Sequence, residues 1–129
     1  MNLWGVIPTD AELRGKWMND TLRASIARQI RQLRESRGMS QEELAKGLDT
    51  SQGSIARLEN PRRCNPTTTT LVRIAEFFDV GLIVKFSTIS EFLLLITADG
   101  VYIKSYQQEA EEIAAALAKD APPEGVTSR

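Results

Sequence analysis

The sequence predicts a mainly α-helical protein with a short β-containing segment near its C-terminal end. Between residues 9 and 79, apolar residues recur with the period of an α-helix, and residues that cap helices precede the periodic stretches. After Asp79 the pattern changes to short apolar and β-branched runs around an Asp-Gly pair. This second pattern is typical of strands and of a hairpin turn.

Five helices are expected before residue 80, over residues 9–18, 20–37, 40–48, 51–60 and 67–79. Two of the expected starts, at Thr9 to Glu12 and at Ser40 to Glu43, have the spacing of a capping box. Gly38 is typical of the position just after a helix. The helix over 20–37 has a single apolar stripe that we expect to face the core, made of Leu22, Ile26, Ile30 and Leu33.

The segment after residue 79 is expected to begin with a strand over Val80 to Phe86. A hairpin follows in the prediction, with strands Phe92 to Thr97 and Val101 to Ser105 joined by a turn at Ala98-Asp99-Gly100. A final helix over Gln107 to Lys119 places four apolar residues on one face: Ala110, Ile113, Ala114 and Leu117. Residues 121–129 are rich in Pro, Gly and Ser, and we expect them to be disordered.

The composition argues against several classes of function. The chain has no histidine and a single cysteine, Cys64, so neither a metal site nor a cofactor is expected. It has no glycine-rich phosphate loop, and an enzyme is not expected. Met1 to Trp4 do not resemble the start of a signal peptide, and the longest apolar run, Phe92 to Ile96, is too short to cross a bilayer. A cytoplasmic protein that does not contact membranes is therefore expected.

The net charge of −1 conceals an uneven distribution of charge. Residues 22–63 hold nine Arg and Lys against five Asp and Glu, whereas residues 86–129 hold three against seven. A basic middle and an acidic end are typical of a nucleic-acid-binding module that carries a second segment with another task. On charge alone, a chance imbalance between two solvated faces is an equal alternative.

The most informative segment is Ser40 to Asn60, SQEELAKGLDTSQGSIARLEN. Two short helices joined by a tight turn must cross closely, which requires a small residue at the crossing, and Ala45 fits this position. Apolar residues suitable for a shared core are Leu44, Leu48, Ile55 and Leu58. The outer face of the second helix is polar, and such a helix can enter the major groove of DNA and contact base edges.

This segment resembles the helix-turn-helix of the lambda-repressor and Cro-like (Xre-type) family. The resemblance covers residues 22–79 and rests on residues at the family's spacing: Arg34, Gln41, Glu43, Leu44, Ala45, Ser51, Gln52, Ser54, Ile55, Leu58, Glu59 and Asn60. It implies a five-helix lambda-repressor-like DNA-binding domain, which the strand, the hairpin and the last helix would extend. It also implies a regulator of transcription, most simply a repressor, that binds double-stranded DNA sequence-specifically.

The resemblance assigns base contacts to the second motif helix. Gln52 would contact a base edge, for which adenine N6 and N7 are the natural partners of a glutamine. Arg57 would contact guanine or a phosphate, and Ser51 and Ser54 would contact the backbone or a base.

Other residues take phosphate contacts or a structural role by the same resemblance. Gln41, at the start of the first motif helix, would contact a phosphate, and helix N-termini favour anions independently. Arg62 and Arg63, in the loop after the second motif helix, would neutralise phosphates. Arg34 and Glu59 match a family pair that forms a structural salt bridge.

Two positions depart from the family pattern. Asp49 occupies the turn position where the family usually has glycine, and aspartate tolerates the left-handed conformation better than most residues. Gly53 lies in the DNA-binding set where many relatives carry a base-contacting side chain, and glycine lowers helix propensity by about 1 kcal/mol. Sequence recognition would therefore use few side chains together with DNA shape.

The predicted organisation has four parts: a helical extension over 1–21, the DNA-binding domain over 22–79, a hairpin plus helix over 80–120 for dimerisation or partner binding, and a disordered tail over 121–129. An exposed edge of the Val80 to Phe86 strand would pair with its two-fold mate. We therefore expect a homodimer whose recognition helices lie about 34 Å apart on a palindromic operator. Two alternatives remain open: an antitoxin-type autorepressor that also binds a toxin through its terminal segment, and a protein-binding module on the same scaffold.

Overall fold

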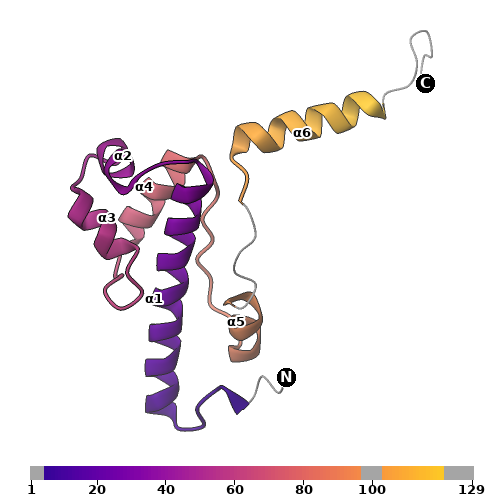
Figure 1. Ribbon diagram of the computed structural model, residues 1–129. Coiled ribbons are helices and arrows are strands. Elements are labelled where there is room, and N and C mark those ends of the chain that lie inside the picture. The colour runs from indigo at the N-terminus through magenta and orange to yellow at the C-terminus, as the bar shows by residue number, and fades with distance from the viewer. Residues whose placement is uncertain (1–4, 97–102, 121–129) are drawn as a thin grey trace.

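The computed structural model describes residues 5–96 and 103–120. Within these ranges the protein is all-helical, with six α-helices and no β-strand. The helices are α1 (Ala11–Ser36), α2 (Gln41–Gly47), α3 (Gln52–Leu58), α4 (Thr68–Phe78), α5 (Ile89–Ile96) and α6 (Tyr106–Lys119). Figure 1 shows α2, α3 and α4 gathered against the C-terminal half of α1, with α5 beside its N-terminal half.

The main core joins α1 to α2, α3 and α4. Its buried members are Ile30, Leu33, Leu44, Ala45, Leu48, Ile55, Ile74 and Phe78. The apolar residues expected to pack at the α2–α3 crossing are therefore buried, and Leu58 packs against the same cluster. Leu22 is the exception on the predicted α1 stripe, because 42% of its surface is exposed. Leu22 belongs to the N-terminal half of α1, and α2 to α4 lie against the other half (Figure 1).

One long helix replaces the two helices expected over 9–18 and 20–37. Helix α1 has 26 residues, and its N-cap is Asp10, whose side chain accepts a hydrogen bond from the Leu13 amide. Asn19 and Asp20 do not interrupt it. Both side chains are exposed, and polar residues on the solvent face of a helix lower its propensity only slightly. Four helices therefore cover the range in which five were expected.

Three helices end in a residue with left-handed backbone conformation: Gly38 after α1 (φ 66°), Asp49 after α2 (φ 54°) and Asp79 after α4 (φ 56°). Each end has the same pair of backbone hydrogen bonds; after α2, for example, the Thr50 amide donates to the Ala45 carbonyl over 2.9 Å and the Asp49 amide to Lys46 over 3.2 Å. This is the Schellman arrangement. Asp49 thus adopts the left-handed conformation at the turn position where the family usually has glycine, as the sequence predicted.

The strand and the hairpin expected after Asp79 are wrong for the described residues. Residues 80–88 are irregular, and Phe92 to Ile96, expected as a strand, belong to α5. Five consecutive apolar residues fit either structure, and here packing selects the helix. The Phe92 ring meets Trp17 of α1 edge-on with centroids 5.6 Å apart, and Leu93 is buried. The expected turn and residues 97–102 lie outside the described residues, as does the tail over 121–129.

The last expected helix is present as α6. It begins with a capping box in which Ser105 and Gln108 exchange backbone and side-chain hydrogen bonds. Two contacts attach its start to the domain: the Tyr106 amide donates to the Asp79 carbonyl over 2.7 Å, and Arg37 donates to the Ile103 carbonyl over 3.2 Å. Beyond this attachment α6 extends away from the other helices (Figure 1).

The two glycines of the α1 region should respond oppositely to alanine. Gly38 has a positive φ, so Gly38→Ala should lower the free energy of unfolding by about 1 kcal/mol. Gly15 lies exposed inside α1, and a Cβ there would meet nothing within 4 Å, so Gly15→Ala should raise it by about 1 kcal/mol. Urea unfolding of both variants measures the two shifts. Equal signs would contradict the assigned end of α1.

Candidate nucleic-acid interface

Helix α3 is short, and a side chain caps its N-terminal end. Ser51 is its N-cap and accepts a hydrogen bond from the Ser54 amide over 3.1 Å. The hydroxyls of Ser51 and Ser54 also lie 2.9 Å apart and share a hydrogen bond. Ile55 is fully buried and attaches the helix to the core. The two serines therefore stabilise the start of α3, whatever else they contact.

The opposite face of α3 is exposed and polar. Gln52, Gly53 and Arg57 are all exposed there. Inside a helix a glycine is normally explained by a crowded neighbour or by a positive φ. Neither applies to Gly53, because a Cβ at this position would meet only the Ser51 hydroxyl, at 3.9 Å. Gly53 therefore leaves bare backbone on the outer face for no reason internal to the fold.

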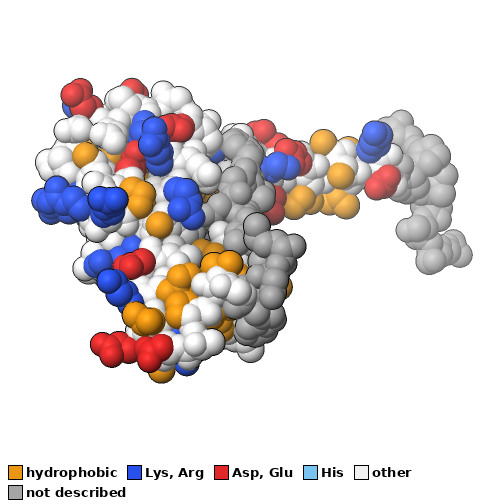
Figure 2. All heavy atoms as spheres, turned by 60° about the horizontal axis from the view of Figure 1, so that its bottom comes forward, with side chains coloured by type: hydrophobic (Ala, Val, Ile, Leu, Met, Phe, Trp, Pro, Cys, Tyr) orange, Lys and Arg blue, Asp and Glu red, His pale blue; other side chains and the backbone are white. Residues whose placement is uncertain are grey.

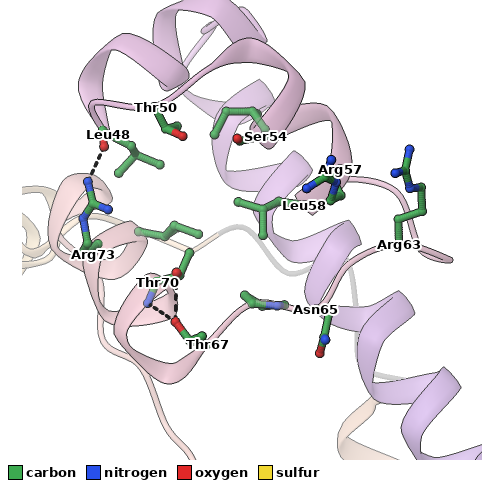
Figure 3. Close-up of a pocket in the computed structure, with 13 residues that line it drawn as sticks. Leu48, Thr50, Ser54, Arg57, Leu58, Arg63, Asn65, Thr67, Thr70 and Arg73 are labelled. Carbon is green, nitrogen blue, oxygen red and sulfur yellow. Dashed lines mark hydrogen bonds between the residues drawn. The ribbon is translucent and has the colours of Figure 1, made fainter.

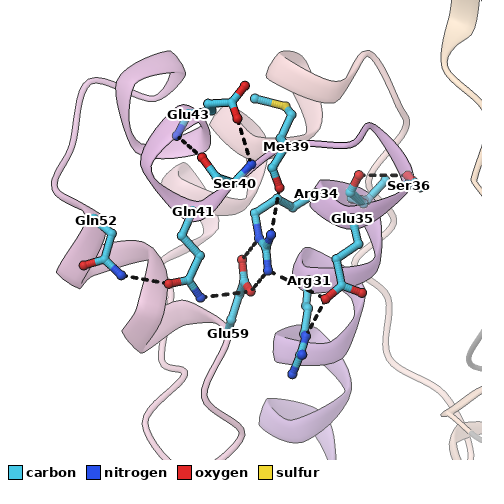
Figure 4. Close-up of polar contacts among 11 residues, drawn as sticks. Arg31, Arg34, Glu35, Ser36, Met39, Ser40, Gln41, Glu43, Gln52 and Glu59 are labelled. Carbon is cyan, nitrogen blue, oxygen red and sulfur yellow. Dashed lines mark hydrogen bonds and ion pairs between the residues drawn. The ribbon is translucent and has the colours of Figure 1, made fainter.

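A chain of hydrogen bonds joins the start of α3 to α1 (Figure 4). The Gln52 amide nitrogen donates to Gln41 Oε1 over 2.8 Å, and Gln41 Nε2 donates to Glu59 Oε1 over 3.3 Å. A carboxylate can only accept, so Glu59 fixes which end of the Gln41 amide faces it. Gln41 then presents its oxygen to Gln52, whose own Oε1 is left to point elsewhere.

The Arg34–Glu59 pair expected from the resemblance is present and is bidentate. Arg34 Nε lies 2.6 Å from Glu59 Oε2 and Arg34 Nη2 lies 2.8 Å from Glu59 Oε1. The exposed fractions of the two side chains are only 12% and 4%. Arg34 also donates to the Met39 carbonyl over 2.8 Å. The hydrogen bond to Glu59 raises the pKa of the Arg34 guanidinium, so the pair stays charged.

A groove of about 480 Å³ lies between α3, the loop after it and α4. Figure 3 shows Arg57 and Arg63 at one end and Arg73 at the other, where Arg73 donates to the Leu48 carbonyl. The rim carries further polar side chains from the loop and α4, namely Asn65, Thr67 and Thr70. The floor is apolar and belongs to the domain core: Leu48, Ile55, Leu58 and Ile74.

Basic side chains gather on the side of the molecule where α2 and α3 lie, at the left of Figure 2. Arg57, Arg62 and Arg63 are exposed. The loop that carries the last two is shaped by Asn60, whose side-chain oxygen accepts from the Arg62 amide over 3.0 Å. The structure thus places Gln41, Gln52 and the three arginines on α3 or on segments adjoining it.

Residues 30–85 match a family model described as helix-turn-helix. This segment is a helix-turn-helix domain of the lambda-repressor-like type. No curated protein and no solved structure matches the chain. The matched domain is characteristic of DNA-binding regulators of transcription and is not an enzyme family.

Several features of the helix-turn-helix domain carry no simple sequence signal. The hydrogen bond between Gln41 and Glu59 joins residues 18 apart, and the bond from Arg73 to Leu48 joins residues 25 apart. A Cβ on Gly47 would lie 2.2 Å from the Phe77 ring, so this glycine allows Phe77 of α4 to pack against the end of α2. The small residue predicted from the sequence, Ala45, was expected at the crossing of α2 and α3 instead. The only sequence signal for the contact with Phe77 is the presence of a glycine, Gly47, at the end of a helix.

Within residues 5–96 and 103–120, no group of His, Cys, Asp and Glu could hold a metal ion, and no helix is long and apolar enough to cross a membrane. Cys64 is fully buried, and this burial raises the pKa of its thiol, which Arg23 partly opposes. The neutral, buried thiol is a core side chain.

The two arginine pairs of α1 allow a matched test of the buried one. Arg34→Ala should lower the free energy of unfolding by about 3 kcal/mol, because it leaves the Glu59 carboxylate buried without its cation. Arg31→Ala removes the exposed Arg31–Glu35 pair of the same helix and should have little effect. Urea unfolding compares them. Similar shifts in the two variants would show that Arg34 and Glu59 do not form a buried pair.

Proposed function

We propose that this protein is a sequence-specific regulator of transcription, most simply a repressor, that places α3 in the major groove of duplex DNA. One observation carries the proposal: α3 is held by a buried apolar side while its outer face presents Gln52, Gly53 and Arg57 to solvent, beside the loop arginines. A helix of this kind fits the width of the major groove. The helix-turn-helix match supports the same conclusion.

Gln52 is the strongest candidate for a base contact. Its amide nitrogen has two N–H groups, of which Gln41 engages one. The remaining N–H and Oε1 together match adenine, whose N7 accepts and whose N6 donates in the major groove. Because Glu59 accepts from the Gln41 amide nitrogen, the Gln41 oxygen faces Gln52 and accepts from its amide nitrogen. The Gln52 amide is thereby held in one orientation in the free protein.

Phosphate contacts would flank this base contact. Gln41 lies at the start of α2, where the first amides of the helix favour an anion. Arg62 and Arg63 are exposed on the loop after α3, and Arg63 borders the groove that ends at α4. Arg57 borders the same groove, so it can serve either a phosphate or guanine. Ser51 and Ser54 would add contacts from the capped start of α3.

We further propose that the protein acts as a homodimer on a palindromic operator. Residues 80–96 and 103–120 carry many exposed apolar side chains: Leu82, Ile83, Val84, Phe86, Leu94, Leu95, Ile103, Tyr106, Ile113 and Leu117. A monomer rarely exposes so much apolar surface in one segment, so this segment suits dimerisation or binding of another protein. An antitoxin that also binds a toxin here is the second candidate, and the same exposed side chains favour it.

Salt dependence separates DNA binding from a protein-binding module on the same scaffold. Affinity for random duplex should fall steeply with added salt, because cations are released from neutralised phosphates. Arg62→Ala and Arg63→Ala should each reduce the slope by about one. The control is Lys16→Ala, which removes one exposed charge from the N-terminal half of α1 and should leave the slope unchanged. Helix α3 lies against the other half of α1 (Figure 1). Fluorescence anisotropy at several salt concentrations measures the slope for the wild-type chain and for the three variants. If the wild-type chain does not bind duplex DNA at low salt, the proposal is refuted.

Gly53 provides a test with two opposed effects. Gly53→Ala should raise the free energy of unfolding by about 1 kcal/mol, because the added methyl meets only the Ser51 hydroxyl, at the ordinary contact distance of 3.9 Å. The same methyl should weaken operator binding if DNA approaches the bare backbone closely. Gly15→Ala, equally exposed in α1, should stabilise the fold and leave binding unchanged. Unaltered affinity of the Gly53 variant would place α3 further from the groove floor.

A further inference from the structure

Helix α6 has a well-capped N-terminus, but none of its side chains is buried against the rest of the described protein. It has 14 residues, a capping box and an ion pair from Lys104 to Glu112, yet none of its side chains is buried. Its large apolar residues Tyr106, Ile113 and Leu117 are 69%, 54% and 68% exposed. Helices of this length are marginal in water by themselves, and their stability normally comes from packing of an apolar face. Figure 2 shows the hydrophobic side chains along this helix.

The exposed apolar face of α6 is a regular stripe. Tyr106, Ala110, Ile113 and Leu117 follow one another at intervals of four, three and four residues. These intervals are the ones that keep side chains on the face along which two helices pack. The stripe is also symmetric about its centre in spacing, because the intervals are the same from either end. A second copy running in the opposite direction can therefore match it residue by residue.

We infer that α6 pairs with α6 of a second copy of this chain in antiparallel orientation. The inference deepens the homodimer proposed above and rests on it. In this register Tyr106 lies opposite the partner's Leu117, and Ala110 lies opposite the partner's Ile113. Each contact at the centre thus joins a small side chain to a larger one, which allows the two helices to approach closely.

The charges of α6 favour the antiparallel orientation over the parallel one. The first half carries Glu109, Glu111 and Glu112, whereas the second half is rich in alanine and ends at Lys119. A parallel pair would bring the two acidic halves to the same level. In the antiparallel register Glu109 lies opposite the partner's Ala114 and not opposite the partner's Glu109, and the two helix dipoles also oppose each other. Glu111 and Glu112 lie level with each other near the centre of the pair, on the side of the helix that faces away from the stripe.

The pair does not need to supply the whole dimer interface. A stable interface buries roughly 1,000 Å² or more in total, and two short helices with one stripe each fall short of this. The exposed apolar residues that precede α6 in the chain, above all Ile83, Val84 and Phe86 at 83%, 73% and 105% exposure, can supply additional area. A second copy of the chain carries the same exposed residues, so it can contribute both its α6 stripe and the apolar residues that precede α6.

Two glutamate substitutions on opposite faces of α6 test the pairing in the full-length chain. Leu117→Glu puts a charge into the stripe and should weaken dimerisation by at least about tenfold, because each dimer loses two buried leucines. Ala115→Glu is the matched control, since position 115 is exposed and faces away from the stripe. Sedimentation equilibrium without DNA measures both. A wild-type chain that is monomeric at micromolar concentration, or equal effects of the two variants, would overturn the inference.

Disulfide trapping tests the orientation. Residues 106 and 117 lie about 16 Å apart along one helix, so a Tyr106→Cys, Leu117→Cys double variant cannot close an internal disulfide. The antiparallel pair predicts a covalent dimer of this variant and none of the single Leu117→Cys variant. A covalent dimer of the single variant would establish the parallel pair instead and refute the register. Cys64 remains in place because it is buried, and the wild-type chain controls for it.

DNA binding by the same variants separates this inference from the proposed function. Leu117→Glu should keep its salt-dependent affinity for a duplex with one half-site, since α6 does not border α3 (Figure 1). Its affinity for a duplex with two half-sites should fall to the single-site value. Loss of all DNA binding in the wild-type chain would refute the proposed function and leave the sedimentation result valid on its own.

Discussion

The buried ion pair between Arg34 and Glu59 is the constraint on which the candidate interface depends. Arg34 belongs to α1 and Glu59 is the C-cap of α3, so the pair joins these two helices. Arg34 also binds the Met39 carbonyl, which fixes the chain as it leaves α1 for α2. Because Glu59 can only accept hydrogen bonds, it orients Gln41 and through it Gln52. The buried carboxylate of Glu59 thus determines which way the exposed Gln52 amide is oriented.

Turn geometry is the second requirement for this arrangement. Helices α2 and α3 are only seven residues each, so neither would be stable by itself. They hold their angle because α2 ends in a left-handed Asp49 and α3 starts at its Ser51 cap only two residues later. Leu48 and Ile55 on either side of the turn enter one core. The ion pair and this core together hold the outer face of α3 in place.

The sequence predicted the helix-turn-helix well because its determinants there are local. Caps at Ser40, Ser51 and Thr67 and the left-handed ends at Gly38 and Asp49 are properties of a few neighbouring residues. The region after Asp79 was predicted poorly because its conformation depends on what packs against it. A strand over Val80 to Phe86 requires a neighbouring strand, and the described residues offer none. The segment that includes Phe92 is helical instead, and its Phe92 ring packs against Trp17 of α1. Hydrogen bonds over long separations, such as the one between Gln41 and Glu59, follow from the fold and not from local pattern.

Because a single domain has few candidate base contacts, the ability of the C-terminal third to join two copies bears directly on sequence recognition. With glycine at position 53, the outer face of α3 offers few long side chains besides Gln52 and Arg57. A wrong base pair costs a DNA-binding protein only about 1–3 kcal/mol, while a genome offers on the order of a million or more competing sites. One such domain therefore cannot select an operator by base contacts alone. In the proposed dimer, two domains on two half-sites double the contacts, and the exposed apolar side chains of residues 82–95 and 103–117 are the surface that can join them.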